Sequence, residues 1–245
     1  IVNHLTYTPA PDIVHEAAGH SPIISDKSYS KYLSNYGKAS SKAIYSKYDD
    51  EIYMTIRNLS DIKENPGACS SDISILENKL KKLIDNTPFI SEAAYLARLN
   101  WWTVEYGLVG KINNPKIFGA GLLSSVGESY NAIFGRVKKI PLSLDCINYS
   151  YDITEQQPQL FVAKDFNHLN EVLDDLTKNM AFKKGGITSI KRAINSQSVC
   201  TFKLDNGLEI SGVPIDFMGD KKEDFFKFSG PVQICYQGKE LSGHG

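Results

Sequence analysis

The sequence predicts a mainly helical protein that ends in a small β module. Three observations lead to this fold class. Apolar residues recur at helical spacing before Phe182, that periodicity disappears after it, and an Asn-Gly turn between two apolar runs follows. Lys183-Lys184-Gly185-Gly186 has the composition of a linker. We therefore expect one domain over residues 1–182 and a β module over residues 183–245.

Four segments have the spacing and end signals of helices. Asn65-Pro66-Gly67 would stop the first, Ser71 or Asp72 would cap the second, and Asp165 would cap the fourth. The third ends at Gly107. The predicted helices cover residues 49–63, 73–84, 91–106 and 166–180.

The β module is predicted from a hairpin pattern. Val199–Leu204 and Leu208–Ser211 flank Asp205-Asn206-Gly207, and Asn-Gly favours a primed turn because both residues tolerate positive φ. Val232–Tyr236 is a further strand candidate.

Composition excludes two classes of function. The 245 residues carry 27 Lys+Arg against 28 Asp+Glu, a net charge of -1, so the chain does not bind nucleic acid by bulk charge. No apolar run is long enough for a transmembrane helix. The 4 cysteines form no CxxC pair and are expected to be reduced thiols in a cytoplasmic protein. No feature indicates an oligomeric state.

The chain is expected to be a fragment, a processed product or part of something longer. It begins with Ile1 instead of an initiator methionine, and the first residues have neither the basic nor the apolar region of a signal peptide.

His15 and His20 are the first candidate ligands. They lie five residues apart in His-Glu-Ala-Ala-Gly-His, whereas the zinc-protease motif spaces its histidines by four. On an ideal α-helix the two side chains would be about 140° apart. They converge only if the helix ends between them, for which Gly19 is a natural stop and Pro22 a block to continuation. Two ordinary histidines are the alternative.

Glu105 is the candidate carboxylate. Two imidazoles and one carboxylate form the facial triad typical of non-haem Fe(II) sites, which leaves positions open for oxygen. Spacing alone does not choose among the 28 acids, but Trp101 lies one turn before Glu105 on the same helix face. A capping or salt-bridged glutamate is the alternative interpretation.

The glycine-rich stretch over residues 118–128 is not a phosphate-binding loop. It lacks both the G-x-G-x-x-G pattern and the Lys-Ser/Thr end of a P-loop. Its glycines suit close backbone approach to a ligand, or equally a tight helix-packing turn.

Three motifs together resemble those of the pterin-dependent aromatic amino acid hydroxylases. They are Pro-Asp-Ile-Val-His-Glu-x-x-Gly-His-x-Pro over residues 11–22, Trp-Thr-Val-Glu-Tyr-Gly-Leu over 102–108, and Gly-Ala-Gly-Leu-Leu-Ser-Ser-x-Gly-Glu over 119–128. The resemblance covers residues 6–180, with an apparent helical insertion within 45–90. The β module lies outside it. The family's pterin-clasping segment, and an arginine that grips the substrate carboxylate, would precede Ile1.

The resemblance implies roles for individual residues. It implies that His15, His20 and Glu105 bind iron and that Glu16 faces the pterin. Ser124 would also orient a ligand histidine, and Ile153 matches a position where tyrosine-hydroxylating members carry an acid, so tyrosine should be a poor substrate. Substrate contacts are implied for Thr8, Pro11, Trp101, Gly121, Ser124 and Ile153.

The implied function is that of a cytoplasmic, bacterial-type phenylalanine 4-hydroxylase of phenylalanine catabolism. Such an enzyme uses Fe(II), a tetrahydropterin and O₂ to convert L-phenylalanine to L-tyrosine. A tryptophan hydroxylase is one alternative, and a non-catalytic relative that binds metal or amino acid is another.

Overall fold

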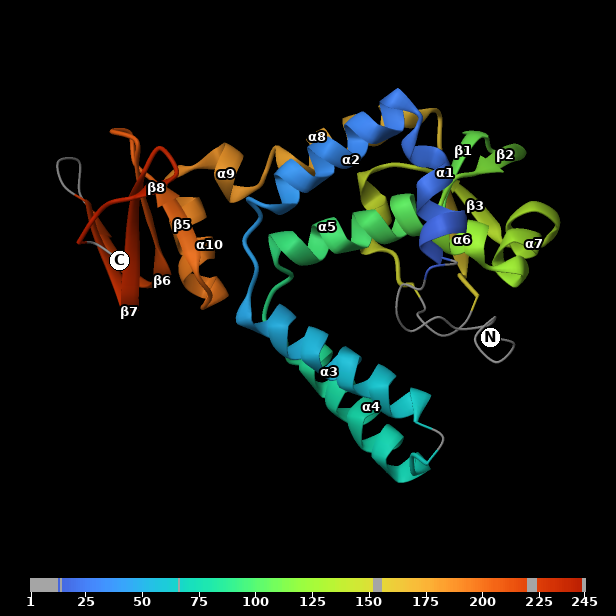
Figure 1. Ribbon diagram of the computed structural model, residues 1–245, viewed down its shortest axis with the longest axis horizontal. Coiled ribbons are helices and arrows are strands. Elements are labelled where there is room, and N and C mark those ends of the chain that lie inside the picture. Colours follow the sequence, from blue (N-terminus) through green and yellow to red (C-terminus); the bar gives the residue numbers. More distant parts are fainter. Residues whose placement is uncertain (1–12, 14, 66, 152–155, 220–223, 244–245) are drawn as a thin grey trace. The chain divides into compact units, whose positions relative to one another are not determined.

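The computed structural model describes residues 13, 15–65, 67–151, 156–219 and 224–243 (Figure 1). The chain divides into two compact units. The first contains residues 1–42 and 95–179, and the second contains residues 43–94 and 180–245. The sequence predicted that a domain over residues 1–182 and a β module over residues 183–245 fold independently, and this stays a prediction.

The first unit is mainly helical, as predicted. Two of its helical segments, η2 and η3, are π-helices, and η3 directly continues α5. Its helices are η2 (His15–His20), α1 (Ser21–Ile24), α2 (Lys27–Ser40), the end of α5 (Glu92–Asn100), η3 (Trp101–Glu105), α6 (Ala120–Ser124), α7 (Val126–Phe134), the 3₁₀-helix η4 (Leu144–Asn148) and α8 (Phe166–Thr177).

A four-stranded sheet in the order β2-β1-β4-β3 forms the core of this unit. β4 runs parallel to both β1 and β3, whereas β1 and β2 form an antiparallel hairpin. The strands are β1 (Gly107–Lys111), β2 (Asn114–Ile117), β3 (Lys138–Pro141) and β4 (Gln159–Ala163). Every residue of β4 is buried. The sequence did not predict this sheet, because β4 is buried on both faces and so lacks the alternating pattern, and the other strands are only 4 or 5 residues long.

α2 and α8 lie side by side (Figure 1) and are joined by a hydrogen bond from the Asn35 side chain to Asn170 Oδ1 at 2.8 Å. The predicted cap of α8 is confirmed, since the Asp165 side chain accepts from His168 N–H. Three leucines of the predicted apolar stripe are buried: Leu169, Leu173 and Leu176. The packing of these helices supports the sheet and the helices that carry the candidate site.

In the second unit, α3 (Lys47–Glu64) and α4 (Ser70–Asp85) pack as a helical hairpin. Ser46 and Asp49 form a capping box at the start of α3, which covers the predicted helix over residues 49–63. α4 begins one turn earlier than its predicted caps: Cys69, rather than Ser71 or Asp72, is the N-cap, and its side chain makes no cap hydrogen bond. Most of residues 45–90 is therefore helical, and that this segment is an insertion relative to the family stays a prediction.

The C-terminal residues form a second sheet, in the order β5-β6-β7-β8 and antiparallel throughout. Its strands are β5 (Cys200–Lys203), β6 (Leu208–Gly219), β7 (Asp224–Tyr236) and β8 (Lys239–Glu240). The predicted hairpin is confirmed, but its turn differs. Gly207 alone among the turn residues has positive φ (86°), and the Asn206 side chain accepts from Leu208 N–H. The expected primed turn is wrong, because every primed turn needs a positive φ at its first central residue and neither Asp205 nor Asn206 has one.

The expectation that helical structure ends at Phe182 is also wrong. α9 (Ala181–Lys184) and α10 (Gly186–Ser196) follow and are separated by Gly185, which has a positive φ, as does Gly186 at the start of α10. The buried face of α10 consists of small residues (Ser189, Ala193 and Ser196). Because such a face carries little hydrophobicity, the sequence pattern did not reveal this helix.

Among the described residues, no helix is both long enough and apolar enough to cross a membrane.

Candidate metal centre

A π-helical segment brings the two predicted histidine ligands together. η2 covers residues 15–20, and in a π-helix the hydrogen bonds join residues five apart, so His15 and His20 lie on one face. Their Nε2 atoms are 3.1 Å apart and the rings meet edge to face. The expectation that the helix must end between them is therefore wrong. The chain passes from η2 directly into α1, whose first turn accommodates Pro22.

Gly19 has a different role from the predicted helix stop. It is the buried residue of η2, and a Cβ built on it would lie 2.8 Å from Ala120 Cβ and 2.9 Å from the Ala120 carbonyl oxygen. The missing side chain lets η2 approach the first residue of α6. This close approach positions the histidines against the helix that carries Ser124.

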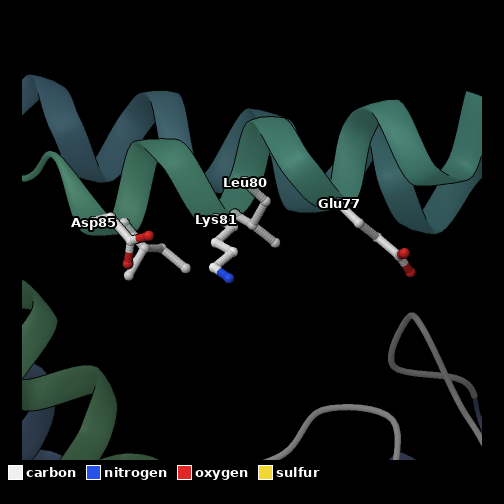
Figure 2. Close-up of a pocket in the computed structure, with 5 residues that line it drawn as sticks. Glu77, Leu80, Lys81 and Asp85 are labelled. Carbon is white, nitrogen blue, oxygen red and sulfur yellow. The ribbon is translucent and has the colours of Figure 1, made fainter.

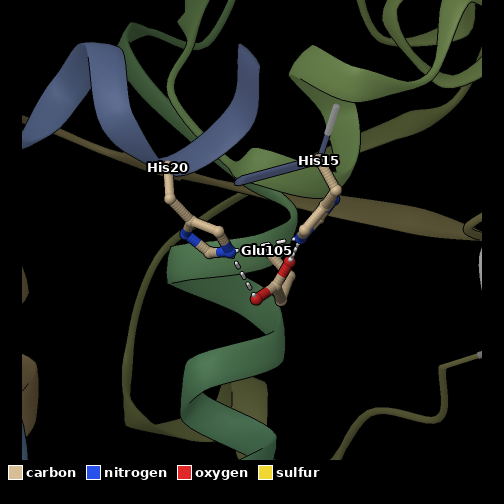
Figure 3. Close-up of side chains that lie close together, drawn as sticks. All are labelled: His15, His20 and Glu105. Atoms are coloured by element: carbon tan, nitrogen blue, oxygen red, sulfur yellow. Dashed lines mark hydrogen bonds and ion pairs between the residues drawn. The ribbon is translucent and has the colours of Figure 1, made fainter. Parts of the chain in front are cut away.

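Glu105, the last residue of η3, completes the cluster (Figure 3). Its two carboxylate oxygens lie 3.4 Å from His15 Nε2 and 3.5 Å from His20 Nε2. The three side chains are mostly buried, with exposed fractions of 16–21%. The structure thus brings together the three residues named as iron ligands, from two segments far apart in the chain.

Ser124 orients His15. The Ser124 hydroxyl donates its only hydrogen to the Ala120 carbonyl at 2.8 Å, so it accepts from His15 Nδ1–H at 2.9 Å. Protonation at Nδ1 leaves the Nε2 lone pair directed toward His20 and Glu105. A partner on the second ring nitrogen is the usual way in which proteins orient a metal-binding histidine. Ser124 therefore lies where the resemblance implied.

The donor set fits a divalent metal ion. One ligand atom from each of the three residues lies within 4.8 Å of the other two. Two nitrogens bound at right angles, each about 2.1 Å from one ion, would be about 3.0 Å apart, close to the observed spacing. The nitrogen–oxygen contacts exceed the usual hydrogen-bond range of about 2.7–3.2 Å, as expected for ligands arranged around an ion. Two imidazoles and a carboxylate suit Fe(II) and also accept zinc.

The other predicted site residues are distributed as follows. Glu16 is exposed and is not part of the three-residue cluster. Trp101 is partly buried at the start of η3. Gly121 packs closely on the end of η3, where an added Cβ would lie 2.9 Å from the Tyr106 ring, so this glycine serves helix packing. Their ligand-binding roles stay predictions. Three residues lie outside the described part of the chain: Thr8, Pro11 and Ile153.

The aromatic surroundings of Trp101 were only partly predicted. Tyr106 and Tyr151 stack on its ring, with centroid distances of 4.9 and 4.7 Å. The Trp101–Tyr106 pair spans five residues and depends on the π-helical turn, in which Tyr106 N–H donates to the Trp101 carbonyl. Burial, with smaller contributions from Glu128 and Glu105, raises the pKa of Tyr106 far above its usual range, so this phenol stays neutral.

An open hollow on α4 is a second surface feature (Figure 2). Its lining residues come from one face of that helix and contain none of the predicted site residues: Glu77, Leu80, Lys81, Ile84 and Asp85. It adds no candidate chemistry to the metal centre.

The donor set is that of the non-haem metal sites with two histidines and one carboxylate. Residues 90–189 match the family model of the biopterin-dependent aromatic amino acid hydroxylases. The human phenylalanine-4-hydroxylase is 32% identical over 166 residues, which is 67% of this chain and 27% of the relative. The Vibrio cholerae phenylalanine-4-hydroxylase is 27% identical over 168 residues, 68% of this chain and 43% of the relative.

These matches confirm the resemblance carried by the sequence motifs. Residues 90–189 of the chain are thus similar to the biopterin-dependent aromatic amino acid hydroxylases, and the curated proteins that it resembles include animal and bacterial phenylalanine-4-hydroxylases. It spans less than half the length of the human and V. cholerae proteins.

Solved structures of the same family are also similar. The phenylalanine hydroxylase of Colwellia psychrerythraea 34H is 24% identical, with a TM-score of 0.47 over 74% of this chain and 55% of that chain. The Chromobacterium violaceum enzyme with bound iron(III) and 7,8-dihydrobiopterin is 22% identical, with a TM-score of 0.47 over 75% of this chain and 52% of that chain.

Proposed function

We propose that the protein containing this chain is an iron- and tetrahydropterin-dependent monooxygenase that hydroxylates the ring of L-phenylalanine to give L-tyrosine. The observation that carries the proposal is the convergence of His15, His20 and Glu105 in a chain whose residues 90–189 match the hydroxylase family. The curated relatives, named phenylalanine-4-hydroxylases, support phenylalanine as the substrate.

The proposed roles follow from the chemistry of each side chain. His15, His20 and Glu105 hold Fe(II) from one side, and Ser124 keeps the His15 lone pair directed at the ion. A bound Fe(II) would activate O₂, with the tetrahydropterin supplying two electrons so that one oxygen atom enters the ring and the other leaves in reduced form. Glu16, exposed beside the cluster in sequence, is proposed to face the pterin.

The aromatic amino acid is proposed to bind against Trp101, with Thr8, Pro11, Gly121, Ser124 and Ile153 as further contacts. Because an apolar side chain at residue 153 offers no hydrogen bond to a phenol, we expect tyrosine to be a poor substrate. Tryptophan as the preferred substrate is the alternative within this class.

A cytoplasmic location is part of the proposal. Its support is that all 4 cysteines are free thiols in the structure, as expected for a reducing compartment.

Metal content tests the proposed ligands. His15→Ala, His20→Ala and Glu105→Ala should each cause a large loss of bound iron, because each removes one of three protein ligands. Glu16→Ala is the matched control: it removes a neighbouring acid outside the cluster, so iron should stay while pterin-dependent turnover falls. Elemental analysis of the four variants measures this. If Glu105→Ala retains iron and Glu16→Ala loses it, the proposed assignment of Glu105 as the carboxylate ligand is wrong.

Turnover by the full-length protein separates the alternatives. An iron- and pterin-dependent yield of tyrosine from phenylalanine is the expected result. A non-catalytic relative would bind iron without forming tyrosine, a tryptophan hydroxylase would convert tryptophan faster, and comparable conversion of tyrosine to a catechol would contradict the interpretation of Ile153.

A further inference from the structure

The orientation of the Trp101 ring is fixed by two kinds of contact. Its indole Nε1–H donates to Gln157 Oε1 at 3.1 Å. Tyr106 and Tyr151 also stack on the ring, each at an interplanar angle of 29°. Stacking sets the plane of the ring, and the hydrogen bond sets its rotation within that plane.

Gln157 is itself held in place by a buried carboxylate. Its side chain reaches Trp101, while its backbone N–H donates to Glu128 Oε1 at 3.0 Å. Gln157 is 2% exposed and Glu128 is 7% exposed. The hydrogen bonds therefore form a continuous chain from α7, which carries Glu128, to η3, which carries Trp101.

A glutamate at residue 128 lowers the stability of the fold. Among the described residues, its second oxygen Oε2 has no hydrogen-bond partner, although it is buried. Leaving such an oxygen unpaired in the interior costs roughly 1–3 kcal/mol. Stability alone would favour an apolar side chain here, so the retained hydrogen bond to the Gln157 backbone indicates a demand for accurate positioning.

The network ends on the helix turn that supplies the carboxylate of the candidate metal centre. Trp101 and Glu105 are the first and last residues of η3. Tyr106, which stacks on Trp101, directly follows Glu105. A change in the orientation of the Trp101 ring therefore occurs in the same helical segment as Glu105.

We propose that Glu128 and Gln157 are positioning residues that fix the indole of Trp101 for binding of the aromatic amino acid. The expected effect on KM rests on the proposed function, whereas the effect on the orientation of the indole does not. Removal of the Gln157 acceptor should raise KM for phenylalanine about fivefold, the usual worth of one buried hydrogen bond, and leave kcat largely unchanged.

The decisive variants are Gln157→Leu and Glu128→Leu, tested in the full-length protein. Glu128→Gln is the conservative rescue, because an amide oxygen still accepts from Gln157 N–H. Gln159→Leu is the matched control: it also removes a buried glutamine whose side chain donates one hydrogen bond, at 2.7 Å to the Ser150 carbonyl, but it does not contact the Trp101 indole nitrogen.

Two readouts are measured. The indole N–H groups of tryptophans give separate NMR signals, and Trp101→Phe identifies the signal that belongs to Trp101. The Trp101 signal should shift and exchange faster with water in Gln157→Leu and Glu128→Leu, but not in Glu128→Gln or Gln159→Leu. Steady-state kinetics should show the rise in KM in the same two variants, and iron content should be unchanged in all four.

The outcomes separate this inference from the proposed function. An unchanged Trp101 signal in Gln157→Leu and Glu128→Leu would overturn the inference whether or not the protein is active. An active protein whose KM is equally raised by Gln159→Leu would also overturn it. If wild-type protein forms no hydroxylated product while the Trp101 signal responds as expected, the proposed function fails and the positioning network stands.

Discussion

Glu128 illustrates how burial sets the chemistry of a single side chain in the first unit. Burial raises the pKa of its carboxyl group above the ordinary value of 4.5, and the hydrogen bond from Gln157 N–H opposes that shift. Because desolvation is the larger effect, the folded protein holds the proton on Glu128 more tightly than the unfolded chain does.

This shift predicts a pH-dependent difference between wild type and Glu128→Gln. Since the folded pKa is the higher one, the stabilising contribution of the neutral acid is present below 4.5 and is lost as pH rises through the folded value. The glutamine variant stays neutral. As pH rises through this range, its free energy of unfolding should therefore increase relative to that of wild type. Urea denaturation at several pH values measures it. A difference that is constant with pH, or that falls, would contradict the shift.

At the scale of elements, the two π-helical segments determine the geometry of the candidate metal centre. η2 aligns residues five apart and so brings the histidines together, while η3 allows Trp101 and Tyr106 to stack. Such segments are rare and occur frequently at functional sites. At η2, Gly19 lies so close to Ala120 of α6 that a Cβ on this glycine would be 2.8 Å from the Ala120 Cβ.

Gly19→Ala should therefore weaken metal binding. The new Cβ would meet Ala120, which forces η2 away from α6 and lengthens the bond from His15 to Ser124. Loss of such a supporting contact typically costs about 10–100-fold in metal affinity. Gly37→Ala in α2 is the matched control, because a Cβ there meets nothing within 4 Å. Metal titration measures both variants, and equal affinities would show that the close approach is unimportant.

At the scale of the whole molecule, residues 43–94 and residues 180–245 form one compact unit. Glu92 connects them: one oxygen accepts from Ala181 N–H at 2.7 Å and from the Arg192 guanidinium at 3.0 Å, and the other accepts from Ile44 N–H at 3.2 Å. A buried carboxylate with several donors is well satisfied. The helical hairpin and α10 thus share a hydrogen-bonded junction within the second unit.

Truncation after Phe182 tests the predicted boundary. Iron binding should persist, because all three proposed ligands precede residue 106 and belong to the first unit. The α3–α4 hairpin should unfold at lower temperature, since Glu92 loses its contact with Arg192. Elemental analysis and thermal circular dichroism measure the two effects, with Glu105→Ala in the truncated chain as the metal-free control. Loss of iron from a truncated chain that remains helical would show that the boundary is wrong.

The elements predicted correctly are those whose signals are local. α3, α8 and the β5–β6 hairpin have caps, apolar stripes or turn residues within a few positions of one another, and local signals survive any tertiary arrangement. The sheet of the first unit and α10 were missed for the opposite reason. β4, which is buried on both faces, and α10, whose buried face consists of small residues, acquire their burial patterns only from what packs against them.

The sequence by itself determined the chemistry of the candidate site: the ligand types, their order in the chain and the family they resemble. It could not determine that His15 and His20 converge, because ideal helical geometry separates residues five apart. Tertiary structure decided that point through the π-helical turn, the contact of Gly19 with Ala120 and the bond from His15 to Ser124. The meeting of the two histidines with Glu105, and the chain of bonds from Glu128 to Trp101, likewise arise from long-range packing that no local pattern encodes.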